Sequence, residues 1–187
     1  MQTKKQLQMM TAKHDALKRN LTGEPVKCHF LKGGTCFKCD PGWEHRGNKC
    51  YRFLTEKLNW DQSRSRCEEL GGHLVKIDSK DEQVRVALFS TQQNEDKFWI
   101  GLTDQEKEDE WLWVDGSKLD ERFDSFWSGK EPDNWKGTNS DGEDCARMGQ
   151  RGGAPDLKCW FDRDCNKPQK SICEKSASTG RVKFNCE

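Results

Sequence analysis

Ten cysteines in a chain of 187 residues constrain its fold more than any other feature of the sequence. An intracellular protein of this size would use so many thiols mainly as metal ligands. The single CxxC motif, Cys36 to Cys39, has no second CxxC motif or histidine pair to complete a zinc site, so disulfide bonds in an oxidising compartment are expected. No apolar run reaches the ~18 residues of a membrane span, and Met1 does not open a signal peptide. We expect an extracellular protein, either secreted after signal removal or the ectodomain of a longer, membrane-anchored precursor.

Residues 1–24 carry the spacing of a short coiled coil. The side chains of its seam recur at steps of three and four residues: Leu7, Met10, His14, Leu17 and Leu21. A single helix of this length is marginally stable in water, so the pattern predicts a homo-oligomer; a lone solvated helix is the alternative. Glycine and proline between 23 and 34 end the helix. We place a helical neck at 1–35 and one globular domain at 36–187.

The globular part predicts the α+β class. A helix is expected over 60–70, where a glycine pair ends it. A second helix opens at Ser79, and Glu82 completes a capping box there. Short aromatic or β-branched runs between turn residues predict strands at 51–53, 74–77, 98–102, 111–116, 145–148 and 171–174. Two helices followed by many short strands are typical of α+β domains.

Acidic and amide side chains gather towards the end of this domain, on a stretch too rich in glycine, asparagine and aspartate for a helix or central strand. They are Glu131, Asp133, Asn134, Glu143, Asp144 and Asp162. Hard oxygen ligands on irregular backbone suit calcium; a solvated acidic loop is the alternative. Residues 104–144 hold 14 acidic and 5 basic side chains, a local net charge of −9 in a chain of net charge 0. That sign argues against a nucleic-acid partner.

Six motifs, in order, resemble the C-type lectin-like domain. They are Trp99–Leu102 (WIGL), Trp111–Gly116 (WLWVDG), Glu131–Asp133 (EPD), Glu143–Cys145 (EDC), Trp160–Cys165 (WFDRDC) and Ile172–Glu174 (ICE). The resemblance covers 39–174 and implies two helices, two small antiparallel sheets and a long ligand-binding loop. The neck and CxxC motif resemble the type II branch, which includes the asialoglycoprotein receptor, the low-affinity IgE receptor and dendritic-cell lectins. It implies calcium as cofactor and glycans or glycoproteins as partners.

The resemblance also implies a set of disulfide pairs. They are Cys39–Cys50, Cys67–Cys173, Cys145–Cys165 and, as in the IgE-receptor branch, Cys36–Cys186. Each closed loop would stabilise the fold by ~2–4 kcal/mol. Two cysteines remain. Cys28 lies near the stem, where we expect an interchain disulfide, and Cys159 lies beside the ligand loops, so a bond between them within one chain is not expected.

In the family, one calcium ion holds the sugar directly. Its ligands, carried over by motif, are Glu131, Asp133, Glu143 and Asp162. A further family ligand, an asparagine, is replaced by Phe161, whose ring can neither coordinate calcium nor donate a hydrogen bond. A supporting calcium site maps to Asp104, Glu108, Asn134, Glu143 and Asp144. A solvated acidic turn is the alternative at this second place.

The resemblance gives two opposing indications about the sugar. The family triplets EPN and QPD each supply an acid and an amide, whereas Glu131 and Asp133 are both acids. A bound hydroxyl could then donate but not accept, at a cost of roughly 1 kcal/mol for each lost hydrogen bond. Trp135 and the glycine-rich loop 137–142 resemble the galactose-binding branch, in which a tryptophan packs on the sugar. We expect a leaning to galactose-type sugars; Trp135 as a packed loop anchor is the alternative.

The sequence leaves three functions open. The acid set and Trp135 favour a calcium-dependent carbohydrate-binding lectin. Phe161 favours a protein-binding relative with little or no sugar binding. An antifreeze-type relative is favoured by Cys159 before Trp160 but opposed by the lack of a partner cysteine in the loop. An enzyme is not expected, because the four histidines lie in the neck and first half of the domain without a nucleophile motif.

Overall fold

The computed structural model describes residues 29–30, 35–90, 97–120, 122, 126–137, 139–149 and 157–181. The chain divides into two compact units, one of Cys39–Ala177 and one of Met1–Lys38 with Ser178–Glu187. The predicted neck seam and Cys28 lie outside the described residues. In the smaller unit the strands are β1 (His29–Phe30), β2 (Thr35–Lys38) and β11 (Ser178–Arg181), with β2 paired antiparallel to the other two.

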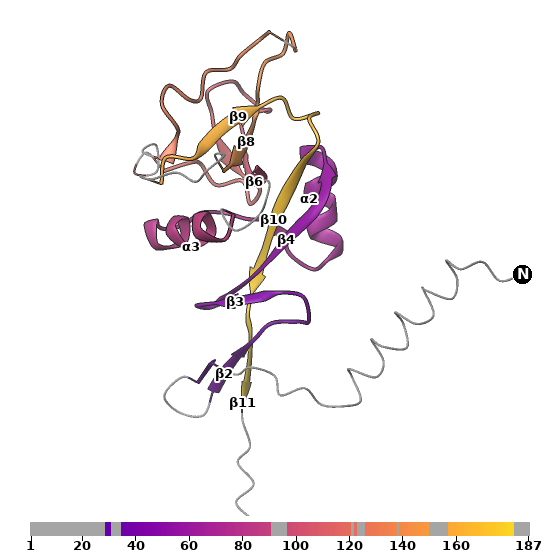
Figure 1. Ribbon diagram of the computed structural model, residues 1–187, viewed down its shortest axis with the longest axis vertical. Coiled ribbons are helices and arrows are strands. Elements are labelled where there is room, and N and C mark those ends of the chain that lie inside the picture. Colours follow the sequence, from indigo (N-terminus) through magenta and orange to yellow (C-terminus); the bar gives the residue numbers. More distant parts are fainter. Residues whose placement is uncertain are drawn as a thin grey trace, which may run out of the picture. The chain divides into compact units, whose positions relative to one another are not determined.

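The larger unit is built on a sheet of eight strands (Figure 1). Their bounds are β3 Glu44–Arg46, β4 Lys49–Leu58, β5 His73–Leu74, β6 Phe98–Thr103, β7 Leu112–Trp113, β8 Cys145–Met148, β9 Trp160–Arg163 and β10 Gln169–Ser176. The order is β3-β4-β10-β6-β8-β9, with β5 on β10 and β7 on β6. The β10–β6 pair is parallel and the other pairs are antiparallel. The predicted α+β class is confirmed, and the parallel pair makes this sheet mixed.

Helix α2 (Trp60–Glu69) begins and ends as the sequence predicts. The Asn59 side chain accepts from the backbone N–H of Gln62 at 2.8 Å, and the Gln62 side chain accepts from the backbone N–H of Asn59 at 3.2 Å. This is a complete capping box. Gly71 follows the helix with φ 76°, the left-handed conformation that suits glycine at a helix end. Trp60 is buried, and its indole N–H donates to a β6 carbonyl oxygen at 2.9 Å.

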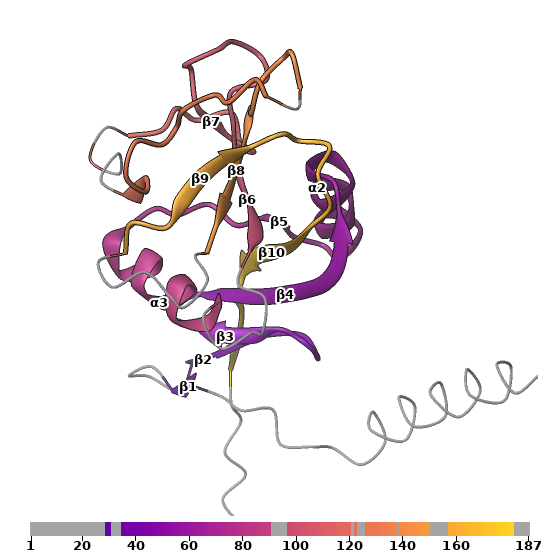
Figure 2. The same cartoon turned by 45° about the horizontal axis from the view of Figure 1, so that its top comes forward.

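Helix α3 (Lys80–Ser90) makes half of the predicted capping box. Ser79 Oγ accepts from the backbone N–H of Glu82 at 3.1 Å. The Glu82 carboxylate instead accepts from the backbone N–H of Asp78 and from Lys49 Nζ, both at 2.8 Å. It is buried, so it links the helix to β4 rather than closing the cap. In both views α2 and α3 lie apart, with β10 between them (Figures 1 and 2).

Two strands are shorter than the sequence predicts. The strand expected over 74–77 ends at its first residue, because the backbone N–H of Lys76 donates to a carboxylate from β10 at 3.1 Å instead of to a strand. The strand expected over 111–116 is reduced to β7 by a turn in which Gly116 N donates to Trp113 O at 2.8 Å.

Strand β9 lies where the sequence predicts loop. It pairs with β8 so that Asp162 is opposite Ala146 and Phe161 is opposite Arg147. Along β9 the burial alternates, with Trp160 and Asp162 buried, as expected for the period of two in a strand. A buried acid in this alternation breaks the apolar pattern that identifies strands, which explains why the strand is not predicted.

Trp160 is at the centre of an aromatic core beneath the long loop. It is fully buried, and its ring packs against those of Trp113, Phe126 and Trp127 with centroid distances of 5.3–5.8 Å. Its indole N–H donates to Gln83 Oε1 of α3 at 3.1 Å. Edge-to-face pairs of this kind add to the stabilisation from burial. The start of β9 is thereby fixed, and with it the position of Asp162.

Three disulfides occur among the described cysteines, and they are pairs that the family resemblance implies. They are Cys39–Cys50, Cys67–Cys173 and Cys145–Cys165. Cys67–Cys173 joins α2 to β10 across 106 residues of sequence, and closing so long a loop restricts the unfolded chain most. The expected Cys36–Cys186 pair involves side chains outside the described residues. Cys159 is buried, and its Sγ accepts from Gln83 Nε2 at 3.3 Å.

Candidate calcium-binding site

Three carboxylates from two separate segments of the chain converge at one place. One oxygen each of Glu131, Asp133 and Asp162 lies within 4.8 Å of the others. The first two lie on the loop before β8, where a cis peptide bond joins Glu131 to Pro132, and Asp162 comes from β9. The loop is held on β9 because Ser128 N donates to a β9 carbonyl oxygen at 2.9 Å and accepts, through its own carbonyl, from Glu131 N at 3.0 Å.

A second link runs through Asn134. Its backbone N–H donates to Asp162 Oδ2 at 2.6 Å, and its side-chain Oδ1 accepts from the backbone N–H of Glu143 at 2.9 Å. Asn134 has φ 44°, a left-handed conformation that asparagine adopts more readily than most residues. Gly142 packs directly on this amide, since a Cβ at that position would lie 1.7 Å from Asn134 Oδ1. The loop therefore brings Asn134 and Glu143 together with Asp162.

The acid cluster has buried oxygens that lack a hydrogen-bond donor. Glu131 Oε2 and Asp162 Oδ1 are both buried without a donor in the described part of the chain. Burial raises the pKa of Glu131 to about 8, with the adjacent Asp162 and then Asp133 and Glu143 adding to the rise. Orphaned carboxylate oxygens and mutual repulsion indicate a place for a cation. The residues present fit a calcium ion, which prefers hard oxygen ligands at flexible geometry.

Glu143 lies beside this cluster and is paired with a cation. Its carboxylate is 4% exposed, and Oε1 accepts from Arg163 Nη1 at 2.8 Å. Burial raises the pKa of Glu143, Arg163 opposes the rise, and the charges of Asp162 and Asp133 add to it. The structure thus brings together three of the four predicted direct ligands and holds the fourth against Arg163.

Arg163 is a site residue that the sequence analysis did not identify. It directly follows Asp162 in the sequence. In the β8–β9 pair it lies opposite Cys145, which brings it near Glu143, two residues before that cysteine. Only the pairing of β8 with β9 reveals this contact, so the sequence could have indicated Arg163 only if β9 had been predicted as a strand.

Phe161 faces a cation instead of the acid cluster. The guanidinium carbon of Arg147 lies 4.2 Å from the centre of the Phe161 ring, which is cation–π contact. Arg147 is buried and also donates from Nη1 to Gly149 O at 2.8 Å. The residue that replaces the family asparagine therefore packs on β8 and offers no oxygen to an ion.

The predicted supporting site has a second group of acids. Asp104 is buried, its Oδ2 accepts from Asp109 N at 3.0 Å, and its Oδ1 has no donor in the described part of the chain. Burial raises the pKa of Asp104 to about 7, and the charges of Glu108 and Asp144 contribute. Burial and Glu108 also raise the pKa of Asp144. The charges of Glu108 and Asp144 act on Asp104, but among the described residues the acids with oxygens within 4.8 Å of one another are Glu131, Asp133 and Asp162. The Asn134 and Glu143 side chains are engaged as described above.

Trp135 stands on the loop next to Asn134 and is 49% exposed, the largest exposed apolar side chain of the described residues. Gly137 lies against its ring, since a Cβ there would lie 2.1 Å from Cζ2 of the indole. One part of the indole is covered by backbone and the rest remains open. This arrangement could present an aromatic surface to a ligand.

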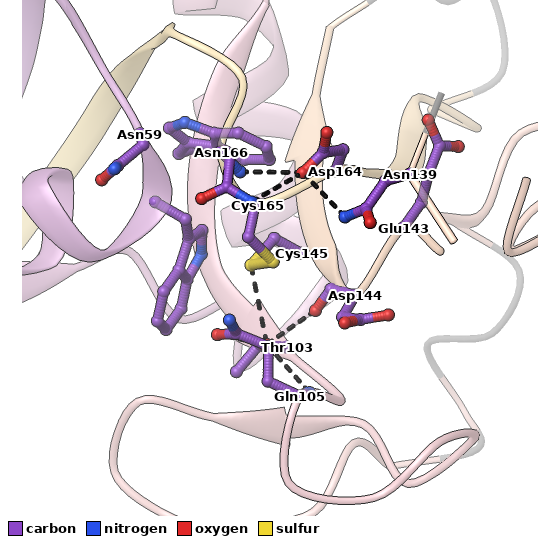
Figure 3. The surroundings of a disulfide bond; sticks show 12 residues. Asn59, Thr103, Gln105, Asn139, Glu143, Asp144, Cys145, Asp164, Cys165 and Asn166 are labelled. Atoms are coloured by element: carbon purple, nitrogen blue, oxygen red, sulfur yellow. Dashed lines mark hydrogen bonds between the residues drawn. A yellow bond between two sulfur atoms is a disulfide. The ribbon is translucent and has the colours of Figure 1, made fainter. Parts of the chain in front are cut away.

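The glycine-rich loop is anchored at the disulfide Cys145–Cys165 (Figure 3). Asp164 is buried next to it, and its Oδ1 accepts from Asn139 Nδ2 at 3.3 Å and from Asn166 N at 3.0 Å. Burial opposes ionisation of Asp164, but these hydrogen bonds outweigh it and lower the pKa. The charged carboxylate thus ties the loop to the end of β9.

The sequence between residues 56 and 175 matches the Lectin C-type domain family. The chain belongs to the C-type lectin family. It is 38% identical over 153 residues to "Hepatic lectin" of chicken (Gallus gallus), covering 79% of the chain and 70% of that protein. It is 37% identical over 150 residues to "C-type lectin domain family 4 member E" of mouse (Mus musculus), covering 80% of the chain and 66% of that protein.

Solved C-type lectin structures share the fold. The mouse scavenger receptor C-type lectin carbohydrate-recognition domain aligns with a TM-score of 0.65 and 37% identity, over 75% of the chain and 99% of that domain. The resemblance inferred from the six motifs is therefore confirmed. C-type lectins are carbohydrate-binding proteins and not enzymes, so family membership also supports the prediction of a binding protein. Among the described residues, no helix has the length and apolarity to cross a membrane.

Proposed function

We propose that this C-type lectin domain binds carbohydrate in a calcium-dependent manner through Glu131, Asp133 and Asp162, with Glu143 as a fourth acid. Two observations support this most: Glu131 and Asp162 each have a buried oxygen without a donor in the described part of the chain, and these residues and Asp133 each bring one oxygen within 4.8 Å of the others. When bound, calcium would supply coordination positions for two adjacent sugar hydroxyls. The carboxylates would accept hydrogen bonds from those hydroxyls, which fixes the orientation of the sugar.

The supporting acids would stabilise the same loop. Asp104, Glu108 and Asp144 could hold a second calcium ion, and Asp144 directly follows Glu143 in sequence. Because Asp104 N donates to Asp144 O at 3.1 Å, an ion there would connect β6 to the start of β8. We assign this ion a structural role, since Asn134 and Glu143, the remaining predicted ligands, link it to the ligand loop.

Galactose-type sugars are the class of ligand that the loop supports best. Trp135 lies one residue after Asn134 and is half exposed against Gly137. An indole in that position could pack on the apolar face of a galactose ring while adjacent hydroxyls face the acids. Mannose-type sugars lack an equally flat apolar face, so the exposed tryptophan favours galactose.

A protein-binding function is the second candidate, and Phe161 favours it. The ring of Phe161 packs on Arg147, so the direct site has one oxygen ligand fewer than the family pattern. A weaker site would leave the same loops available for a protein partner. The two functions differ in one observable, which is sugar binding that depends on calcium.

Extracellular location and assembly through the neck complete the proposal. The three disulfides of the larger unit suit an oxidising compartment. The seam of residues 1–24 would join copies of the chain, with an interchain disulfide at Cys28. Several weak sites in one oligomer would raise avidity for glycans or glycoproteins by orders of magnitude.

A glycan array with and without chelator tests this function. We expect galactose-terminated glycans to be bound in calcium and lost in chelator, and Asp162→Asn to reduce binding in calcium. Asp120→Asn is the matched control, because Asp120 is paired with the exposed Arg122. Binding of no glycan by the wild-type protein in calcium would favour the protein-binding alternative.

A further inference from the structure

Within the described ranges, side-chain amide donors are few around the acid cluster. A sugar hydroxyl that donates a hydrogen bond to a carboxylate can still accept one, because its oxygen keeps lone pairs. Beside several carboxylates, a hydrogen-bond donor from the protein would stabilise that oxygen. Asn134 uses its amide oxygen on Glu143 N and packs against Gly142. The amides of Asn139 and Asn166 donate to Asp164. Two of these three amides are therefore directed to Asp164, and Nδ2 of Asn134 is the amide donor left beside the acids.

Arg163 adds further donors beside the cluster. A guanidinium carries five N–H groups in a fixed fork, and the contact described above uses one of them on Glu143, at 2.8 Å. The Arg163 side chain is 41% exposed, so a ligand can reach it. Glu143 in turn interacts electrostatically with Asp162, Asp133 and Glu131. The guanidinium is thus placed at the edge of the acid cluster by its pairing with Glu143.

The other cations near the loop occupy different positions. Arg147 is buried against Phe161. Lys136 lies where its charge acts on Asp144 of the supporting group, and Lys167 pairs with Asp164 at 3.6 Å. Among the described residues, Arg163 is the cation that pairs with a predicted direct ligand, Glu143.

We infer that Arg163 determines specificity by donating a guanidinium N–H to a sugar hydroxyl oxygen held at the Glu131, Asp133 and Asp162 cluster. This inference rests on the proposed function and deepens it. The guanidinium replaces the amide donors lost at Asp133 and Phe161, which restores the pairing of acid and donor that adjacent hydroxyls need. Neutral sugars with two adjacent hydroxyls are the expected ligands.

Calorimetry on Arg163→Met tests the inference with methyl galactoside and methyl mannoside in calcium. Methionine keeps much of the side-chain length and removes the donors. We expect affinity for the better of the two sugars to fall by roughly 5- to 10-fold, the effect of one lost hydrogen bond. Affinity for calcium alone should not fall, because the change removes a positive charge that is paired with Glu143. Arg122→Met is the matched control, since Arg122 is exposed on Asp120.

A readout independent of affinity is the NMR signal of the Arg163 Nε–H group. It should shift when the sugar is added to the calcium-loaded protein and stay unchanged when the sugar is added in chelator. Arg163→Lys keeps the charge but not the fork, so it should recover only part of the sugar affinity.

The outcomes separate the two proposals. If Arg163→Met binds sugar as the wild type does, Arg163 has no part in recognition while the lectin function stands. If calcium and sugar affinities fall together by the same factor, Arg163 only positions Glu143, and the inference is overturned. If the wild-type protein binds calcium but neither sugar, the proposed function fails and the role of Arg163 fails with it.

Discussion

The backbone N–H of Asn134 donates to Oδ2 of Asp162 at 2.6 Å, across 28 residues of sequence. A hydrogen bond to a charged acceptor is among the stronger ones in proteins. Oδ1 of the same carboxylate is buried without a donor in the described part of the chain. The candidate site is therefore arranged by the fold itself, through the loop and β9, and an ion would complete it.

Replacing Phe161 by asparagine should strengthen the direct calcium site. The change adds an amide oxygen where the family has one and removes the cation–π contact with Arg147. We expect calcium affinity to rise by about 10-fold, as for one added ligand worth ~1.4 kcal/mol, and sugar affinity to rise with it. The lost packing should cost roughly 1 kcal/mol of stability. Calorimetry of Phe161→Asn, with Phe161→Leu as control, measures this; equal isotherms for all three proteins would show that Phe161 does not limit the site.

Gly137→Ala should disturb Trp135 without unfolding the domain. The added Cβ would lie 2.1 Å from the indole, and because the ring is 49% exposed it can swing away. We expect galactoside affinity to fall about as far as in Trp135→Ala, while the free energy of unfolding changes by less than ~0.5 kcal/mol. Urea unfolding and sugar titration are the two measurements. Unchanged sugar affinity in both variants would identify Trp135 as a loop anchor.

Much of the fold could be predicted, because its signals are local. The helix over 60–70 and the glycine pair that ends it could be predicted directly from the sequence. Strand β9 could not, because Asp162 is an acid at a buried strand position. The family motifs predict which acids form the site, but only the strand register shows that Arg163 reaches Glu143. The incomplete capping box of α3 also depends on a contact distant in sequence, because the Glu82 carboxylate accepts from Lys49 of β4.

Stability should fall as the pH rises from about 5 to 8, through Glu174. This residue is 2% exposed, and burial raises its pKa from 4.5 to about 7, with Lys49 opposing and Glu82 adding. Between those values the folded protein holds a proton that the unfolded chain releases. The free energy of unfolding should therefore decrease by roughly 2–3 kcal/mol across this window.

Urea unfolding at pH 5 and pH 8, in calcium, measures this change. Glu174→Gln cannot titrate, so the difference between the two pH values should be smaller in the variant by a similar amount. The lost contact with Lys49 affects the variant at both pH values, so it largely cancels in the change of unfolding free energy between pH 5 and pH 8. The same change of unfolding free energy with pH in the wild type and in Glu174→Gln would contradict the assignment to Glu174.

Calcium titration by calorimetry of the wild-type protein and Glu131→Gln tests the central claim most directly. Glu131 contributes a buried, donor-free oxygen to the cluster, so its neutralisation should remove one bound calcium ion or weaken it by at least ~10-fold. The supporting site at Asp104 should remain, and Asp120→Asn should match the wild type. We predict that result; no calcium binding by the wild-type protein, or equal isotherms for wild type and Glu131→Gln, would contradict the account.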